Sequence, residues 1–285
     1  MKELLSRLFQ SANSPLAILI GHRGLSAHFP ENTIPAFAAA LEKGASMIEL
    51  DMRLSKDRQA VVIHDETVER TTNGKGMVKD LTLAEIQSLD AGFHFSKVEN
   101  QYPFRGRGIV VPSLEQVFAA FPQALIAVEL KENSEAACHA LYELLKRFDR
   151  FDSTLVQVFS IDHKLGKLMR SLDKRIQTGH TTKEIVTFST AARLKVTRLV
   201  KPKSPIFEVP MRLRVSNLPI VTAAFMKACR KRNIKVLVWT VNDEALIRKL
   251  YKMGAAGIYT DDVERSKAII ESVARETKNH GSSTK

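Results

Sequence analysis

The sequence predicts an α/β protein, a TIM-type (β/α)8 barrel with a small insertion after the third strand. Short apolar runs alternate with helix-length amphipathic stretches along the 285 residues, the pattern of a parallel sheet covered by helices. About eight such units fit this length, which favours a closed barrel over an open doubly wound sheet. The open sheet is further disfavoured because no Gly-x-Gly-x-x-Gly sequence follows the first apolar run.

The apolar runs set the expected strands, and the amphipathic stretches between them set the expected helices. The expected strands are Leu16–Gly21, Met47–Leu54, Ala60–His64, Leu125–Leu130, Thr154–Phe159, Ile176–Gly179, Ile206–Val209, Ile234–Thr240 and Gly257–Thr260. The expected helices are Thr33–Lys43, Ser113–Phe121, Glu135–Arg147, Asp162–Leu172, Thr222–Arg232 and Glu244–Met253.

One connection is too short to contain a helix. Only Ser55–Gln59 join the second and third runs, so we expect these two strands to form an antiparallel hairpin. A turn centred between Asp57 and Arg58 places Asp51 opposite His64. A slip of one residue would turn these side chains to the other face of the hairpin.

We expect a single barrel domain over residues 1–285, in which residues 65–111 form the insertion over one mouth of the barrel. The insertion is rich in glycine and contains one expected helix, Leu83–Leu89. Residues 278–285 are polar and are expected to form a disordered tail. The segment Met1–Phe9 reads as a short amphipathic helix that packs on its own domain; the alternative is a weak contact with a membrane surface.

Composition narrows the classes of function. Lys and Arg number 43 against 31 Asp and Glu, and the formal net charge of +12 favours anionic partners. The basic residues are scattered, without an aromatic-basic reading motif or zinc-ligand spacing, so we expect no nucleic-acid partner.

No segment approaches ~20 consecutive apolar residues, so no transmembrane segment is expected. Cys138 and Cys229 form no Cys-x-x-Cys pair and read as buried thiols, which fits a cytoplasmic protein.

Three carboxylates in two expected strands are candidate metal ligands. Glu49 and Asp51 are two residues apart and therefore share one face of a strand, and Glu129 shares a face with Lys131. Carboxylates in strands usually face solvent, but the neighbours of these residues are apolar, and strands covered by helices leave a watery face only at the barrel mouth. All-oxygen ligation suits Ca²⁺ or Mg²⁺.

Two histidines close strands beside these carboxylates. His22 and His64 are candidates for a general acid and a general base, because imidazole titrates near pH ~6.5. Arg23 offers a fork of donors that matches phosphate oxygens, and Lys131 adds a point charge. Trp239 ends a late strand, where it either fills the core or walls a small-molecule pocket.

These residues lie in strings that resemble the glycerophosphodiester phosphodiesterase family. The resemblance spans residues 16–270, and the combination of strings is far more specific than any one of them. The strings are His22-Arg23-Gly24, Pro30-Glu31-Asn32-Thr33, Glu49-Leu50-Asp51, His64-Asp65, Thr71-Thr72-Asn73-Gly74-Lys75-Gly76, Leu89-Asp90-Ala91-Gly92, Val111-Pro112-Ser113-Leu114-Glu115, Glu129-Leu130-Lys131, Trp239-Thr240-Val241-Asn242 and Gly257-Ile258-Tyr259-Thr260-Asp261.

The resemblance implies a TIM-type barrel that hydrolyses glycerophosphodiesters to glycerol 3-phosphate and an alcohol such as choline or ethanolamine. It implies one divalent cation, Ca²⁺ or Mg²⁺. It also implies roles for eight residues: metal ligands at Glu49, Asp51 and Glu129, catalytic histidines at His22 and His64, phosphate contacts at Arg23 and Lys131, and a wall for the glycerol at Trp239.

The hypothesis for the reaction is that one histidine deprotonates a glycerol hydroxyl while the other protonates the leaving alcohol, and that water then opens a cyclic phosphate. Related barrel activities, a lysophospholipase D or a phosphatidylinositol-type phospholipase C, are the alternatives, and a nucleic-acid-binding protein is a remote one. The stretch 181–219 departs from the family pattern and is unusually basic, so the head group is the least determined feature, and the oligomeric state stays open.

Overall fold

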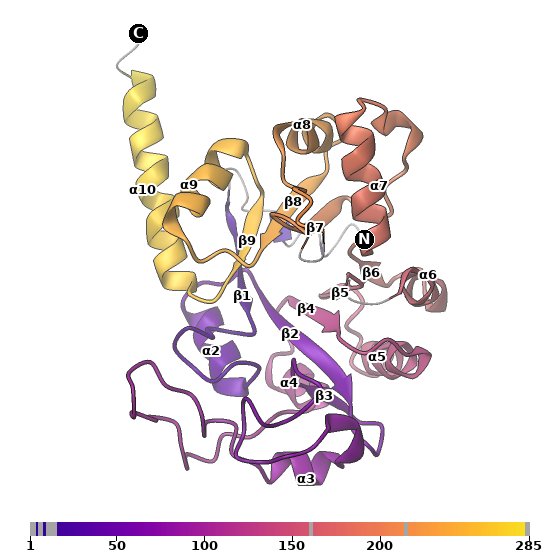
Figure 1. The fold of residues 1–285 in the computed structure, drawn as a ribbon, viewed down its shortest axis with the longest axis vertical. Coiled ribbons are helices and arrows are strands. Elements are labelled where there is room, and N and C mark those ends of the chain that lie inside the picture. Colours follow the sequence, from indigo (N-terminus) through magenta and orange to yellow (C-terminus); the bar gives the residue numbers. More distant parts are fainter. Residues whose placement is uncertain (1–3, 5–7, 10–15, 160–161, 214–215, 283–285) are drawn as a thin grey trace.

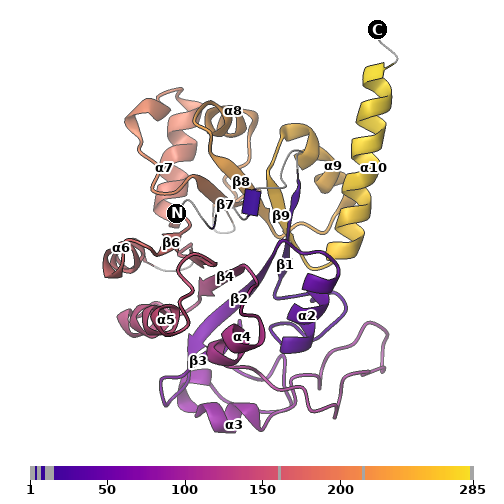
Figure 2. The ribbon, with the colours of Figure 1, turned by 180° about the vertical axis from the view of Figure 1, so that it is seen from behind.

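The computed structural model describes residues 4, 8–9, 16–159, 162–213 and 216–282. Within these ranges eight parallel strands curl into one sheet, in the order β6-β5-β4-β2-β1-β9-β8-β7, and helices cover its outside (Figures 1 and 2). The strands are β1 (Ile18–His22), β2 (Met47–Leu54), β4 (Ile126–Leu130), β5 (Thr154–Gln157), β6 (Gln177–Thr178), β7 (Ile206–Pro210), β8 (Lys235–Trp239) and β9 (Gly257–Thr260). The predicted barrel is confirmed.

The outer helices follow the strands along the chain. They are α2 (Ile34–Glu42), α4 (Leu114–Ala120), α5 (Glu135–Arg147), α6 (His163–Leu172), α7 (Thr182–Arg193), α8 (Ala223–Lys231), α9 (Glu244–Met253) and α10 (Val263–Ser282). None of the described helices is both long enough and apolar enough to cross a membrane.

Strands β6 and β7 meet through side chains, since no ladder joins them in the described part of the chain. His180, just after β6, donates from Nδ1 to the carbonyl of Ile206 at 3.0 Å and accepts at Nε2 from the backbone N–H of Lys203 at 3.2 Å. Gly179 leaves room for Glu208, because a Cβ at this glycine would lie 2.2 Å from the Glu208 carboxylate. These contacts complete the circle.

The inner face of the barrel has two layers with different chemistry. The lower layer is an apolar cluster of Leu4, Leu8, Ile18, Ile20, Met47, Leu125, Ala127, Leu155, Ile206, Leu237 and Tyr259. Alternate residues of a strand share a face, so the residue two positions further along each strand also points inward. Those residues form an upper, mostly polar layer of His22, Glu49, Glu129, Gln157, Glu208 and Trp239.

Two residues of the expected N-terminal helix contribute to the lower layer. Leu4 and Leu8 are buried in it, which agrees with packing of this segment on its own domain. Their side chains are therefore not available for the membrane contact considered for residues 1–9. The rest of that segment, apart from Phe9, lies outside the described residues.

The predicted hairpin is confirmed, but its predicted register is wrong by one residue. β3 (Ala60–Val62) pairs antiparallel with β2, with Met52 opposite Val62 and Leu54 opposite Ala60, so Asp51 does not lie opposite His64. The cause is a three-residue turn: Ser55 N–H donates to the Gln59 carbonyl at 3.0 Å, and Arg58 adopts a left-handed conformation with φ 59°. A turn of this kind is centred on one residue rather than between two.

Residues 65–111 form a small layer on β3, at the lower end of the view in Figure 1. This segment contains the short 3₁₀ helix η1 (Val78–Asp80) and α3 (Leu83–Gln87), which begins at a capping box between Thr82 and Glu85. The layer has its own apolar cluster of Val61, Ile63, Val68, Val78, Ile86, Ala91 and Val111.

Two helices were not predicted. The first is α7, and the second is α10, which extends through residues 278–282, a part of the expected disordered tail. Helix α7 begins at a capping box between Thr181 and Glu184, a signal that the sequence contains. Its inner face includes Ser189 and alanines beside Ile185 and Phe188, so the apolar periodicity is weak.

Candidate active site

The three predicted carboxylates meet at the carboxyl ends of two neighbouring strands. Glu49 and Asp51 lie on β2 and Glu129 on β4, and Asp51 is paired with Glu129 in the parallel ladder. One oxygen of each carboxylate lies within 4.8 Å of one oxygen of each other carboxylate. Glu49 and Asp51 are buried, so their charges are poorly screened by solvent.

The electrostatics of this cluster fit a bound cation. Burial, together with the charge of Asp51, raises the pKa of Glu49 to about 8. Burial also acts to raise the pKa of Asp51, but the positive charges of Lys131 and Arg23 outweigh it, and the pKa of this carboxyl falls below its ordinary value. Asp51 Oδ1 is buried and has no hydrogen-bond partner. A largely buried set of carboxylates with an unsatisfied oxygen matches the ligands that hard divalent cations prefer.

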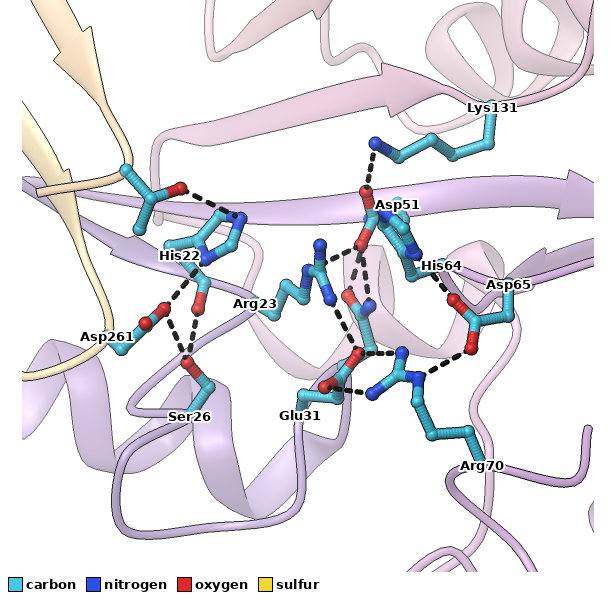
Figure 3. Close-up of polar contacts among 12 residues, drawn as sticks. His22, Arg23, Ser26, Glu31, Asp51, His64, Asp65, Arg70, Lys131 and Asp261 are labelled. Atoms are coloured by element: carbon cyan, nitrogen blue, oxygen red, sulfur yellow. Dashed lines mark hydrogen bonds and ion pairs between the residues drawn. The ribbon is translucent and has the colours of Figure 1, made fainter. Parts of the chain in front are cut away.

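Lys131 and Arg23, the predicted phosphate contacts, also lie at the carboxylates, and Figure 3 shows both beside Asp51. Lys131 Nζ is 2.8 Å from Glu129 Oε2 and 3.2 Å from Asp51 Oδ1. The backbone N–H of Arg23 donates to Glu49 Oε2 at 2.9 Å, and its Nε lies 3.1 Å from Asp51 Oδ2. The contacts of Asp51 Oδ1 and of Arg23 Nε are ion pairs by distance only, because neither atom has a partner in hydrogen-bonding geometry.

His22 ends β1, and Asp261, which directly follows the last strand, β9, orients its ring. Its Nδ1 donates to Asp261 Oδ1 at 2.7 Å, and Nε2 lies 3.5 Å from Thr240 Oγ1. Asp261 is held in turn by Ser26 Oγ at 3.0 Å and by Asn242 Nδ2 at 2.5 Å. Burial lowers the pKa of His22, but the hydrogen bond to Asp261 and the charge of Glu49 raise it, and the net shift is upward.

His64 has a similar partner. Its Nδ1 donates to Asp65 Oδ1 at 2.6 Å, and Asp65 Oδ2 accepts from Arg70 Nε at 2.5 Å. Burial lowers the pKa of His64 below its ordinary value, and the nearby charge of Asp51 offsets only part of this effect. Arg70 also donates two hydrogen bonds of 2.8 Å to Glu31, which ties the segment after β3 to the loop after β1 (Figure 3).

The loop after β1 is shaped by backbone conformations that few residues adopt. Gly24 has φ 86°, and a Cβ at this position would lie 2.6 Å from the backbone of Ala36. Asn32 follows with φ 57° and donates from Nδ2 to Asp51 Oδ2 at 2.8 Å, while its Oδ1 accepts from the Asp51 backbone N–H at 3.3 Å. The loop therefore fixes Asp51 from the side opposite β4.

A cavity of about 700 Å³ opens above the upper layer. Seven of the eight predicted site residues line it: His22, Arg23, Glu49, His64, Glu129, Lys131 and Trp239. The eighth, Asp51, lies behind them and is fully buried. In the same cavity Trp239 packs edge-to-face on Phe159, with 4.8 Å between ring centroids, and Met211 and Leu246 extend this apolar wall.

Several residues of the site were not predicted as such. Asp261, Asp65 and Asn32 stand in the strings that carry the family resemblance, but sequence alone did not assign them as partners of His22, His64 and Asp51. Glu208 and His180 also line the cavity. Glu208 had a usable signal, because it is an acidic residue between apolar neighbours in the expected strand Ile206–Val209. His180 had none.

Comparisons with known proteins agree with this geometry. The model of the glycerophosphoryl diester phosphodiesterase family matches residues 22–265. A glycerophosphodiester phosphodiesterase of Caldanaerobacter subterraneus is 34% identical over 254 residues, which cover 87% of this chain and 95% of that protein. A lysophospholipase D of Homo sapiens is 26% identical over 265 residues, which cover 85% of this chain and 82% of that protein.

A solved structure of similar fold contains a bound product. It is a phosphodiesterase of Oleispira antarctica in complex with sn-glycerol-3-phosphate, 25% identical to this chain with a TM-score of 0.71. The likeness covers 90% of this chain and 97% of that one.

Proposed function

Because the chain belongs to the glycerophosphoryl diester phosphodiesterase family, we propose that its cavity hydrolyses glycerophosphodiesters to sn-glycerol 3-phosphate and an alcohol. The observation that carries this proposal is the placement of three carboxylates, within 4.8 Å of one another, beside two histidines that line the same cavity. Each histidine is held at Nδ1 by an aspartate, so Nε2 is the ring nitrogen left for proton transfer.

Glu49, Asp51 and Glu129 are the residues that would hold the divalent cation of this metal-dependent family. Their all-oxygen donor set supports Ca²⁺ or Mg²⁺ rather than a softer ion. When bound, the cation supplies positive charge that polarises the phosphate and favours ionisation of a glycerol hydroxyl.

The basic side chains at the carboxylates bind and orient the substrate. Arg23 and Lys131 line the cavity beside Glu49 and Glu129, which supports a role for both in contacting non-bridging phosphate oxygens. An arginine fork matches two such oxygens, whereas a lysine contributes a compact charge.

The two histidines move the protons. In the first half-reaction one histidine accepts the proton of a glycerol hydroxyl as that oxygen attacks phosphorus, and the other protonates the oxygen of the leaving alcohol. In the second, water attacks the cyclic phosphate: the histidine that gave its proton takes one from water, and the first returns its proton to the glycerol oxygen. The hydrogen bonds to Asp261 and Asp65 keep both rings oriented throughout.

The apolar part of the cavity contacts the glycerol and the alcohol. Trp239 and Phe159 form an apolar wall there, which suits the carbon skeleton of glycerol.

We place the protein in the cytoplasm, since Cys138 and Cys229 are buried free thiols and a reducing compartment maintains such thiols.

A substrate panel tests the proposed function. Glycerophosphocholine, glycerophosphoethanolamine and glycerophosphoglycerol are assayed for release of glycerol 3-phosphate, with and without EDTA. We expect release that EDTA abolishes and added Ca²⁺ or Mg²⁺ restores. A lysophospholipid in the same panel tests the lysophospholipase D alternative, which would require faster turnover of the lysolipid. Absence of glycerol 3-phosphate from every diester would contradict the proposal.

A further inference from the structure

The excess of positive over negative charge is concentrated in one fifth of the chain, although basic residues occur throughout the sequence. Residues 185–242 contain twelve Lys and Arg and one acidic residue, Glu208, so they carry +11 of the net charge of +12. Glu208 is buried in the barrel and does not offset charge on the outside. This segment comprises most of α7, β7, α8 and β8, and α7 and α8 lie side by side in Figures 1 and 2.

Large aliphatic side chains are exposed in the same segment. Leu199 is 85% exposed, Leu194 67% and Val196 41%, and they make up half of the exposed large hydrophobic side chains of the described residues. All three belong to residues 193–203, the connection between α7 and β7 that contains the 3₁₀ helix η2 (Thr197–Leu199), called the 193–203 loop below. Its other exposed side chains are the basic Arg193, Lys195, Arg198, Lys201 and Lys203, and it contains no acidic residue.

The backbone that presents these leucines is anchored. Arg232, just after α8, donates from Nη1 to the carbonyl of Thr197 at 2.6 Å and to that of Val200 at 2.5 Å. The Val196 N–H closes the end of α7 by donating to the Ala191 carbonyl at 2.9 Å. Leu194 and Leu199 are therefore held outward by a structured loop rather than by a frayed end.

A basic cavity of about 230 Å³ adjoins the 193–203 loop. Four exposed lysines line it, Lys167, Lys183, Lys201 and Lys203, over an apolar base that includes Phe188 and Phe207. Its one acidic side chain, Glu184, is already paired with Arg170 through hydrogen bonds of 2.7 and 2.9 Å. The cavity has the charge and the size to accept a phosphate group with part of its alkyl chain.

We propose that the 193–203 loop and the adjoining end of α8 dock on an anionic phospholipid surface, with Leu194 and Leu199 inserted at the headgroup boundary. An anionic leaflet attracts clustered basic side chains, and its interface accepts aliphatic side chains that water disfavours. A nucleic acid would use the charge but not the leucines, and the loop offers no aromatic side chain on which a base could stack. The inference does not depend on the activity proposed for the cavity.

Vesicle co-sedimentation with the full chain tests this inference. Vesicles of phosphatidylcholine alone are compared with vesicles that also contain phosphatidylglycerol. We expect binding that requires phosphatidylglycerol and weakens with salt. Leu194→Ser/Leu199→Ser and Lys195→Gln/Arg198→Gln should each weaken it by about tenfold or more. Matched controls on other surfaces, Val98→Ser and Lys249→Gln/Lys252→Gln, should bind like the wild type.

Each contrary result overturns the proposal in a distinct way. Equal binding to both kinds of vesicle excludes recognition of anionic lipid. Wild-type binding by the leucine variant excludes insertion. Tighter binding to duplex DNA, unaffected by the leucine substitutions, assigns the surface to nucleic acid. A dimer that forms without vesicles and is lost in the leucine variant assigns the surface to a second copy of the chain. Turnover of a soluble glycerophosphodiester verifies that each variant is folded, since none of these residues lines the catalytic cavity.

Discussion

The imidazole of His22 and the carboxylate of Asp261 are joined by a hydrogen bond of 2.7 Å, although 239 positions separate them in the chain. His22 ends β1 and Asp261 directly follows β9, and these strands are neighbours in the sheet. The bond fixes which ring nitrogen carries the proton and leaves Nε2 for chemistry, since a carboxylate partner sets both the tautomer and the ring orientation.

Replacement of Asp261 by Asn should lower kcat by roughly 10–100-fold with little change in KM, because Asn positions the ring poorly and adds no negative charge. The lost carboxylate should also shift the pH profile of kcat to lower pH, because Asp261 raises the pKa of His22. Steady-state rates across pH measure both effects. An unchanged profile together with a lower Tm would reduce Asp261 to a structural role.

His22→Ala and His64→Ala should each reduce kcat by about 10²–10⁴-fold, since each variant removes one partner of a linked proton transfer. The double variant should lose little more than either single variant, because the two rings act as one unit. Single-turnover rates of the three variants check this. Multiplicative losses would indicate that the histidines act independently.

Added Ca²⁺ or Mg²⁺ should raise the Tm of the wild type, because an ion that binds only the folded state stabilises it by mass action. Glu129→Gln should lose most of this rise, because it removes one of the three carboxylates that meet within 4.8 Å. Thermal unfolding with EDTA and with each ion measures the effect without relying on activity. Glu132→Gln, outside the cluster, is the control; an equal shift in both variants would place the ion elsewhere.

Glu208 should make stability depend on pH between about 4.5 and 7. Burial raises the pKa of its carboxyl to about 7, while hydrogen bonds from Tyr259 and Gln157 oppose the shift. The folded state therefore keeps a proton that the unfolded chain releases, so stability falls as pH rises through this range and then levels off. Glu208→Gln should remove that fall and gain at most about 3 kcal/mol above pH 7. Urea unfolding of the wild type and the variant across pH measures the free energy of unfolding of each. If the two stability-versus-pH curves are parallel, the prediction is contradicted.

Much of the fold could be predicted because each strand has an alternation of inward and outward residues in its own sequence. Glu49 and Asp51 point inward because they stand two and four residues after Met47, which also points inward. This alternation follows from the sequence of β2 and does not depend on its partner strands. The hairpin register required the conformation of Arg58, which the sequence does not encode visibly, since arginine seldom adopts a positive φ. The error therefore moved His64 off its predicted partner without moving Asp51 out of the site.

The partners of the candidate catalytic groups were harder to predict, because they come from distant parts of the chain. Arg70 reaches Glu31 and Asp65 at once, and Asn32 reaches Asp51 only because the loop after β1 folds back over β2. Periodicity predicts which face a side chain occupies, but not which loop crosses it. Helix α10 was missed for a different reason: its long charged run resembles a solvated tail until the barrel provides a surface for Val263, Ile269 and Val273.

The apolar lower layer also orders events in time. Leu4, Leu8 and the strand residues around them fill the barrel beneath the candidate catalytic groups, so within the described part of the chain the cavity opens at the carboxyl ends of the strands. The diester, the alcohol, water and glycerol 3-phosphate must all pass through that opening. In the reaction proposed above, the released alcohol has to leave before a water molecule can occupy its place at phosphorus, so passage through one opening separates the two half-reactions in time.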